Sequence, residues 1–362
     1  MDKNEHCLTF NGIVKHFNPA WFAAVMGTAV IPLAIAFSKI PLKMPLATFF
    51  FSIAILMFLA ALVPWTIKLF RYPAEFKKDL NHPVAGNFLP TMPISLIIFS
   101  LIFLKFPEMV FSQSVSYNIA FYLWLLGSIG IYVMGFIILI HIFRHKGIDL
   151  PHANFGWYIP PVSKLIISVA GFELARVFPQ SMELTFGLSI VSLGVGFFLF
   201  MFVGAAVYHR YIYHELPINR FAATFFIGVA PTAIIAIVLF KMIQFFEQTS
   251  LLSIDPHVFV PVAKILILAT WGFSIWWFCM AVIVILYYIR KMDLPYALSW
   301  WAFTFPAGAL SVASGVAWKV SGFSFVYYIY GLSLIFLLVM WIIVFIRTAK
   351  GVASGKIFAP TH

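Results

Sequence analysis

Ten long, predominantly apolar stretches follow one another along this chain, with short polar segments between them. A bilayer core roughly 30 Å thick needs about 20 apolar residues per helical span, whereas a membrane β-strand needs only about 10 alternating ones. Hydrophobic residues make up 63% of the chain and charged residues 10%, whereas soluble domains are nearer half apolar and a quarter charged. The sequence therefore predicts an all-α integral membrane protein. The predicted spans cover residues 19–38, 46–70, 87–106, 117–143, 157–178, 184–208, 222–246, 256–289, 297–318 and 324–346.

The spans leave little sequence for any other domain. We expect a cytoplasmic N-terminal tail at 1–17, a ten-helix transmembrane domain at 18–348 and a cytoplasmic C-terminal tail at 349–362. Asn18 and Pro19 are typical of a helix N-cap and first helical position, and residues 1–17 lack the order of a signal peptide. Cys7 and Cys279 lie far apart in sequence, which excludes a disulfide framework and a CxxC metal site.

The net charge of +11 is distributed unevenly along the chain. If tails and loops alternate between two sides, fifteen of the 23 Lys and Arg residues fall on the side that holds both termini. The five on the other side are Lys39, Lys43, Lys105, Lys241 and Lys319, and the three inside spans are Lys164, Arg176 and Lys264. The positive-inside rule then places both termini in the cytoplasm of a bacterial or archaeal cell. The basic excess reflects membrane topology, so we expect no nucleic-acid partner.

Prolines recur inside the odd-numbered spans. They are Pro32, Pro93, Pro160 with Pro161, Pro231 and Pro306, and successive ones lie 61 to 75 residues apart. That spacing is the length of one helical hairpin. Proline breaks a helix, and in a bilayer broken helices are tolerated where they are buried or line a cavity. We therefore predict five hairpins, with the kinked odd-numbered helices forming an inner ring around a pore. The alternative is that proline is simply commoner in membrane helices.

Small residues accompany these prolines and allow two interpretations. They permit close packing of helices, or they leave a narrow lumen free of side chains. We include Gly27 of the first span and Thr304 of the ninth among the residues expected to line the pore.

Several of these stretches together resemble the tellurite-resistance/dicarboxylate transporter family. They are "NPAWFAAVMGTAVIP", "NHPVAGNFLPTMPIS", "GWYIPPVSK", "FAATFFIGVAPTAI" and "SWWAFTFPAGALSVAS". This family includes plant slow anion channels, the bacterial tellurite-resistance channel homologue, and fungal malate and sulfite transporters. The resemblance implies ten helices in five hairpins and a homotrimer with a pore in each subunit.

The same resemblance implies that a phenylalanine before the proline of the ninth helix closes the pore, which corresponds to Phe305. A bulky apolar ring across a narrow lumen blocks ions by size and by dewetting. Phe303 lies about 200° away around a helix, so both rings cannot point into the lumen.

The fifth span carries three charges. On a helical wheel, Lys164 shares a weakly polar face with Ser168, while Glu173 lies opposite and Arg176 off that face. We predict that Lys164 and Ser168 face the pore, where the lysine attracts anions, and that Glu173 and Arg176 form a structural ion pair. The alternatives for Lys164 are an acidic partner or a position at the membrane interface. Lys264 is a possible second cation, although pairing with Glu173 or Glu183 is the better expectation.

These features favour gated conduction of small inorganic or organic anions. The alternative is a proton-coupled carrier or exporter of C4-dicarboxylates such as malate or succinate. We expect no enzyme activity, metal or cofactor, because only His141 among the ten histidines lies within a span. His82 and His152 precede inner helices, where they could make transport sensitive to pH.

Overall fold

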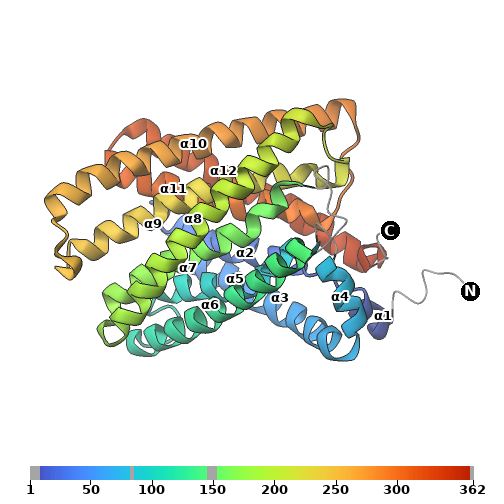
Figure 1. Ribbon diagram of the computed structural model, residues 1–362, viewed down its shortest axis with the longest axis horizontal. Coiled ribbons are helices and arrows are strands. Elements are labelled where there is room, and N and C mark those ends of the chain that lie inside the picture. Colours follow the sequence, from blue (N-terminus) through green and yellow to red (C-terminus); the bar gives the residue numbers. More distant parts are fainter. Residues whose placement is uncertain (1–8, 82–84, 145–152, 359–362) are drawn as a thin grey trace, which may run out of the picture.

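A computed structural model describes residues 9–81, 85–144 and 153–358 of the chain, and all regular structure in them is helical (Figure 1). His82 and His152, together with Cys7, lie outside these ranges. Eight helical segments among the described residues are long and apolar enough to cross a membrane. Two shorter inner helices of 15 and 17 residues complete the ten. The predicted all-α membrane class is thus confirmed.

The even-numbered spans are continuous α-helices of 29 to 36 residues. At a rise of 1.5 Å per residue each is longer than the roughly 30 Å bilayer core. They expose many large apolar side chains, as expected for helices that face lipid. These outer helices are α3 (Lys43–Arg71), α6 (Gln113–Arg144), α8 (Met182–Tyr213), α10 (Pro256–Lys291) and α12 (Ser324–Ala353).

The odd-numbered spans are built differently. The first is the short helix α2 (Trp21–Ile35), and the other four change from a 3₁₀ segment to an α-helix partway along. These pairs are η2 (Ala85–Phe88) with α5 (Thr91–Lys105), η4 (Phe155–Tyr158) with α7 (Ile159–Val177), η6 (Asn219–Val229) with α9 (Ala230–Phe246), and η8 (Leu298–Phe303) with α11 (Phe305–Ser321).

The prolines mark these changes of helix type. Pro160, Pro161, Pro231 and Pro306 stand in the first turn of the α-helical part, and Pro93 is the third residue of α5. An amide N–H at those positions has no intrahelical acceptor, so proline removes no helix hydrogen bond there. Only Pro32 lies inside an inner α-helix. The predicted interior kinks at the other prolines are therefore corrected to junctions between 3₁₀ and α structure.

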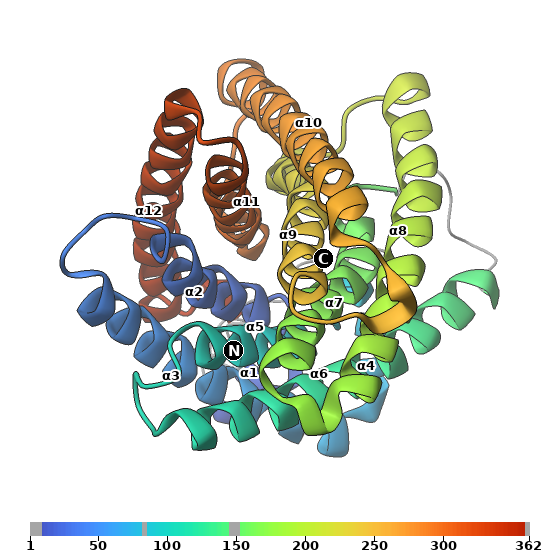
Figure 2. The ribbon, with the colours of Figure 1, turned by 90° about the vertical axis from the view of Figure 1, so that its left-hand side faces the viewer.

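Each inner helix packs most extensively on the outer helix that follows it, which gives the five predicted hairpins. The inner helices also contact one another in a closed order, α2–α5–α7–α9–α11 and back to α2. Figure 2 shows the outer helices surrounding this inner ring. Because every inner helix is followed by one outer helix, all five inner helices run in the same direction and their C-terminal ends meet at one end of the ring.

Glycines allow α2 and α11 to approach closely. A Cβ added at Gly308 would lie 2.3 Å from Val30 Cγ1, and one at Gly315 would lie 2.4 Å from Phe37 Cγ. Here small residues serve helix packing, which is their common role in membrane bundles.

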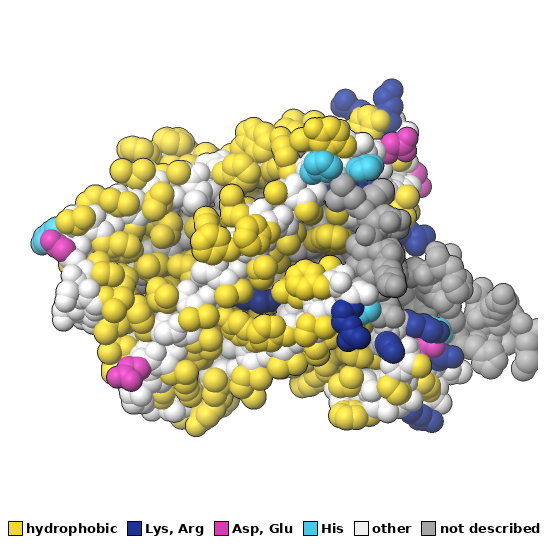
Figure 3. Space-filling model, viewed as in Figure 1, with side chains coloured by type: hydrophobic (Ala, Val, Ile, Leu, Met, Phe, Trp, Pro, Cys, Tyr) yellow, Lys and Arg dark blue, Asp and Glu magenta, His cyan; other side chains and the backbone are white. Residues whose placement is uncertain are grey.

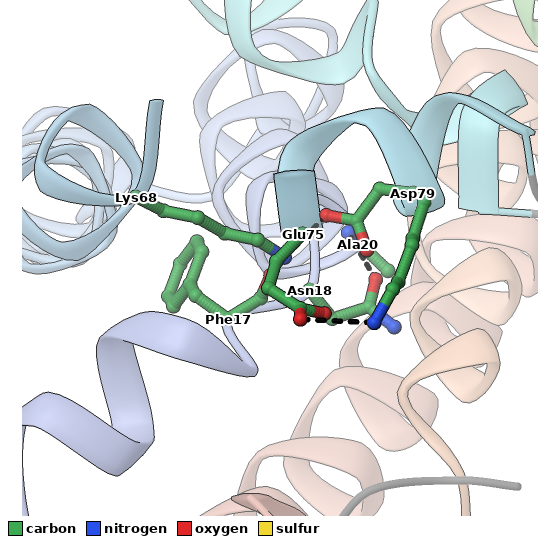
Figure 4. A network of polar contacts seen from close by, with 7 residues as sticks. Phe17, Asn18, Ala20, Lys68, Glu75 and Asp79 are labelled. Carbon is green, nitrogen blue, oxygen red and sulfur yellow. Dashed lines mark hydrogen bonds and ion pairs between the residues drawn. The ribbon is translucent and has the colours of Figure 1, made fainter. Parts of the chain in front are cut away.

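Short helices α1 (Phe10–Lys15) and α4 (Pro73–Asn81) lie at the end of the bundle at which the described part of the chain begins and ends (Figure 1). Basic side chains gather at that end (Figure 3). Lys68, buried at the end of α3, donates to the Phe17 carbonyl over 2.8 Å and forms an ion pair with Asp79 of α4 (Figure 4). One lysine thus ties the outer helix α3 to both the N-terminal segment and α4.

Candidate functional site: a cavity inside the inner ring

A cavity of about 130 Å³ lies within the inner ring, and all five inner helices contribute to its wall. Most of the wall is aliphatic or aromatic. The lining comes from Val30, Leu33 and Phe37 (α2 and just beyond); Ile98, Leu101, Leu104 and Lys105 (α5); Ile166, Val169 and Glu173 (α7); Ile234, Ile237, Phe240, Lys241 and Gln244 (α9); and Phe305, Ala309, Val312, Val316 and Lys319 (α11).

Three lysines lie at the end of the cavity where the inner helices finish. Lys105 is the last residue of α5, Lys319 lies in the last turn of α11, and Lys241 lies in the C-terminal part of α9. Converging helix C-termini carry partial negative charge, which repels anions. The lysine side chains reverse that sign, so this mouth attracts anions. Lys105 and Lys319 are exposed to solvent there.

One acidic side chain lies in the described lining of the mouth. Glu173 accepts a hydrogen bond from Arg176 Nη2 over 2.6 Å and another from Lys241 Nζ over 2.8 Å. Lys105 and Lys319 instead lie near the ring of Phe37, with their Nζ atoms 5.8 and 5.2 Å from its centroid. A cation close to an aromatic face is stabilised by the ring quadrupole. The lining therefore keeps a positive balance.

Phe305 lines the cavity at the other end of α11. It lies fourteen residues before Lys319, which corresponds to about 21 Å along the helix axis. Its side chain is partly exposed, whereas Phe303 is buried and packs on Phe226 with ring centroids 4.9 Å apart. The two rings thus have the different environments that the helix geometry predicts.

The cavity lining contains no described residue from η2, η4, η6 or η8. Large side chains of these segments are buried and reach outer helices: Phe155 packs on Trp277 and Phe226 on Phe278 of α10, and Trp301 donates to Thr348 of α12. The lining thus extends from the lysine mouth as far as Phe305.

The face of α7 that we expected to line the pore packs elsewhere. Lys164 is 3% exposed, and its Nζ lies beside Gly135 of α6, where an added Cβ would be 2.5 Å away. Ser168 Oγ donates to the Ser189 carbonyl of α8 over 2.8 Å. Neither belongs to the cavity lining, and no hydrogen-bond partner of Lys164 Nζ is found among the described residues. The small, weakly polar face lets the outer helices approach, while Ile166, Val169 and Glu173 face the cavity.

Three further sequence predictions are revised by the geometry. Gly27 and Thr304 contact each other, since a Cβ at Gly27 would lie 1.9 Å from Thr304 Oγ1, and neither lines the cavity. Lys264 is exposed on the outer helix α10 and forms no ion pair with the described part of the chain. Glu173 and Arg176 do form an ion pair, and the second cation on Glu173 is Lys241.

Lys105, Lys241 and Lys319 were not predicted as site residues, because they were counted only as charges of the membrane side that carries fewer Lys and Arg residues. A usable signal was present: each follows an inner span or lies near its C-terminal end. Helices that run in one direction bring such residues together. Among the described residues, no group of three His, Cys, Asp or Glu side chains could hold a metal ion.

The fold and the cavity define a multi-pass helical membrane protein with a positively charged entrance and an apolar interior. Residues 16–349 match the model of the voltage-dependent anion channel family, SLAC1. The chain belongs to this family, whose function is anion transport.

Its relatives are named as transporters of several kinds. An uncharacterized transporter of Methanocaldococcus jannaschii is 34% identical over 89% of both chains. A sulfite efflux pump of Arthroderma benhamiae is 24% identical over 83% of this chain and 81% of its own length. The malic acid transport protein of Schizosaccharomyces pombe is 22% identical over 81% of this chain and 68% of its own.

Proposed function

We propose that this protein conducts small anions across the cytoplasmic membrane through the central cavity, with Phe305 as the gate. The observation that carries the proposal is one cavity, lined by all five inner helices, with three lysines at its mouth and Phe305 at the other end of its α11 wall. A positively charged mouth concentrates anions, and an apolar constriction blocks them until it widens or becomes hydrated.

The gate acts through its volume and its lack of polarity. The walls near Phe305 are aliphatic, so water in this part of the cavity has few hydrogen-bonding partners. A hydrated anion that reaches the ring would have to give up water without replacement ligands, which is costly. Movement or truncation of the ring removes that barrier.

The topology proposed with this function has the N- and C-terminal tails, 1–17 and 349–362, in the cytoplasm. The lysine mouth then opens to the outside. The basic side chains around α1 and α4 support this orientation, because cytoplasmic segments carry an excess of Lys and Arg. The assembly is proposed to be a homotrimer with a separate pore in each subunit, without a catalytic role.

A second candidate is a proton-coupled C4-dicarboxylate carrier. The relative named as a malic acid transport protein favours it, as do several lysines around one mouth, which could hold two carboxylates. A carrier requires saturable uptake that follows a proton gradient.

The two candidates are separated by flux in liposomes. Purified wild-type protein and Phe305→Ala are reconstituted, and chloride, nitrate and malate fluxes are measured with and without a pH gradient. The channel proposal predicts that Phe305→Ala raises chloride and nitrate flux at least about tenfold, a change equivalent to roughly 1.4 kcal/mol in the barrier. Saturable, gradient-driven malate uptake with no chloride flux in either form would instead support the carrier.

Phe303→Ala is the matched control. It removes the same ring two residues away, from a buried position that does not line the cavity. Truncating a buried phenylalanine costs about 3–5 kcal/mol of stability, so Phe303→Ala should lower thermal stability without opening a conductance.

A further inference from the structure

The three lysines at the cavity mouth, Lys105, Lys241 and Lys319, differ in whether they have a carboxylate partner. Lys241 is bound by Glu173 over 2.8 Å, whereas no carboxylate among the described residues lies within ion-pair distance of Lys105 or Lys319. Glu173 is mostly buried, with its side chain 9% exposed. Two ammonium groups are thus available to an incoming anion, and the third already has an anionic partner.

The partners of Glu173 form a site suited to a small oxyanion. Arg176 and Lys241 come from neighbouring inner helices, α7 and α9, and their shortest hydrogen bonds go to different oxygens of one carboxylate. Charge-assisted hydrogen bonds of this kind recognise carboxylates in general. The Glu173 carboxylate therefore occupies a position in which formate or another small carboxylate could make the same two contacts.

We infer that Glu173 is a built-in competitor, whose carboxylate occupies the Lys241–Arg176 site and thereby keeps anion binding at the mouth weak. The inference rests on the proposal that anions enter this cavity. Conduction needs binding that is favourable enough for entry and weak enough for release. With Lys241 engaged, a passing anion meets two available ammonium groups; without Glu173 it meets three, in a partly buried place where salt screens charge poorly. Glu173 is thus a positioning residue that sets the specificity and affinity of the mouth through Lys241.

A purely structural role is the competing explanation, because the same ion pair joins α7 to α9. The two roles differ in their dependence on Lys241. Competition predicts that neutralising Glu173 strengthens anion binding only while Lys241 is present. A structural tie predicts lower thermal stability without that dependence.

The test is calorimetric titration of the detergent-solubilised full-length protein with sodium formate, a measurement that does not require the gate to open. We expect Glu173→Gln to bind formate about tenfold more tightly than wild type, since Lys241 and Arg176 lose their competing carboxylate. In the Lys241→Met background, adding Glu173→Gln should change formate affinity by less than about twofold, the signature of a coupled pair. If Glu173→Gln does not fold, Glu173→Asp keeps the charge on a shorter side chain, and an intermediate gain in affinity is expected.

Unchanged formate affinity in folded Glu173→Gln would overturn the inference. Equal tightening with and without Lys241 would also overturn it. Flux in the Phe305→Ala background then separates this result from the proposed function. If Phe305→Ala passes no anion while the calorimetric coupling is present, the gate proposal fails and the competitor role stands. If Phe305→Ala conducts and the coupling is missing, the reverse holds.

Discussion

The inner and outer helices differ in how burial within the protein relates to the hydrophobicity of the helix. In the most buried inner segment, η4 with α7, every residue of the most apolar 18-residue stretch is buried within the protein. In the corresponding stretches of α8 and α10, only 17% of the residues are buried. The same segment is also the least hydrophobic of the eight candidate spans. In a soluble protein, burial and hydrophobicity rise together. Here lipid surrounds the molecule, so the outer helices can be apolar on every side and polar groups are found inside.

This contrast explains where function can be located. Charged and polar side chains within the bilayer are costly, so they persist where neighbours or a cavity stabilise them. Glu173, Lys241 and the other mouth residues all belong to the inner ring. The outer helices supply length, lipid contact and the surfaces on which the inner helices pack.

From this contrast we predict that larger side chains are poorly tolerated between inner helices and well tolerated on the lipid-facing surface of outer helices. Gly308→Leu on α11 should give the largest effect, because its Cβ alone would lie 2.3 Å from Val30. Overpacking typically costs about 1–3 kcal/mol, and a contact this close with a stiff, β-branched side chain should exceed that range and abolish folded protein. Gly331→Leu on α12 is the matched control, since no atom lies within 4 Å of its added Cβ. Size-exclusion yield and thermal unfolding provide the measurement. Equal yields of the two variants would contradict the expected difference in packing between inner and outer helices.

Lys68 gives a further test of the difference between inner and outer helices, because it is a buried charged residue on an outer helix. Lys68→Met on α3 should destabilise the protein by about 2 kcal/mol, because it removes a buried hydrogen bond to the Phe17 carbonyl and an ion pair with Asp79. Unfolding monitored in mild detergent measures the loss, and a value below about 0.5 kcal/mol, the range of exposed pairs, would show that the network carries little.

Exposed Lys78 provides the control for that prediction. It pairs with Glu75 over 2.9 Å on α4, and its hydrogen bond lowers the pKa of the Glu75 carboxyl. That stabilisation is present above the unfolded-state pKa of the carboxyl and is lost as pH falls through the folded-state value. Lys78→Ala should cost less than about 0.5 kcal/mol at neutral pH, and the difference from wild type should vanish in acid. A difference that grew as the pH fell would contradict this assignment.

Removing the two available mouth cations should reduce transport without affecting the fold. We expect Lys105→Met with Lys319→Met to lower anion flux about tenfold in the Phe305→Ala background, since local anion concentration depends on the potential of the mouth. The effect should weaken at high ionic strength. Lys264→Met, on the lipid-facing side of α10, should leave flux unchanged. A similar loss in both variants would indicate that total charge, and not the mouth, determines flux.

The smallest expected effect on flux concerns a lysine of the inner ring that faces outward. Lys164→Met should leave anion flux unchanged, because the side chain contacts α6 and not the cavity. Stability should stay equal or rise by about 1 kcal/mol, since a buried amine that has no hydrogen-bond partner among the described residues is replaced by an apolar side chain. A loss of flux comparable with that of the mouth variants would place Lys164 in the conduction path after all.

The helical architecture could be predicted from the sequence because long apolar stretches and regularly spaced prolines indicate it. The ten spans and the alternation of prolines follow from spacing alone, and neither depends on how the helices are rotated. Rotation is what the sequence left open. The wheel for the fifth span separated Lys164 from Glu173 correctly, but small polar residues suit a lumen and a close helix contact equally well. The contacts of Lys164 with Gly135 and of Ser168 with Ser189 show that this face of α7 packs against outer helices.

The cationic mouth could not be recognised for a related reason. Charge counting places Lys105, Lys241 and Lys319 on one side of the membrane, yet it does not say that they surround one opening. That follows only when the inner helices are known to run in parallel and end together. Phe305 came from family resemblance, because nothing in its own sequence context distinguishes it among 42 phenylalanines.

The central claim is that anions pass through the cavity of the inner ring, and a cysteine block tests it most directly. Val312 lines the cavity between the mouth and Phe305, and Ile335 of α12 is exposed on the outside of the bundle. Val312→Cys and Ile335→Cys are each combined with Phe305→Ala, and chloride flux is measured before and after an anionic methanethiosulfonate. Phe305→Ala alone, which retains the exposed native Cys279, gives the background. We expect the reagent to abolish flux through the Val312→Cys form only. Undiminished flux through a Val312→Cys form that mass spectrometry shows to be modified would contradict the account.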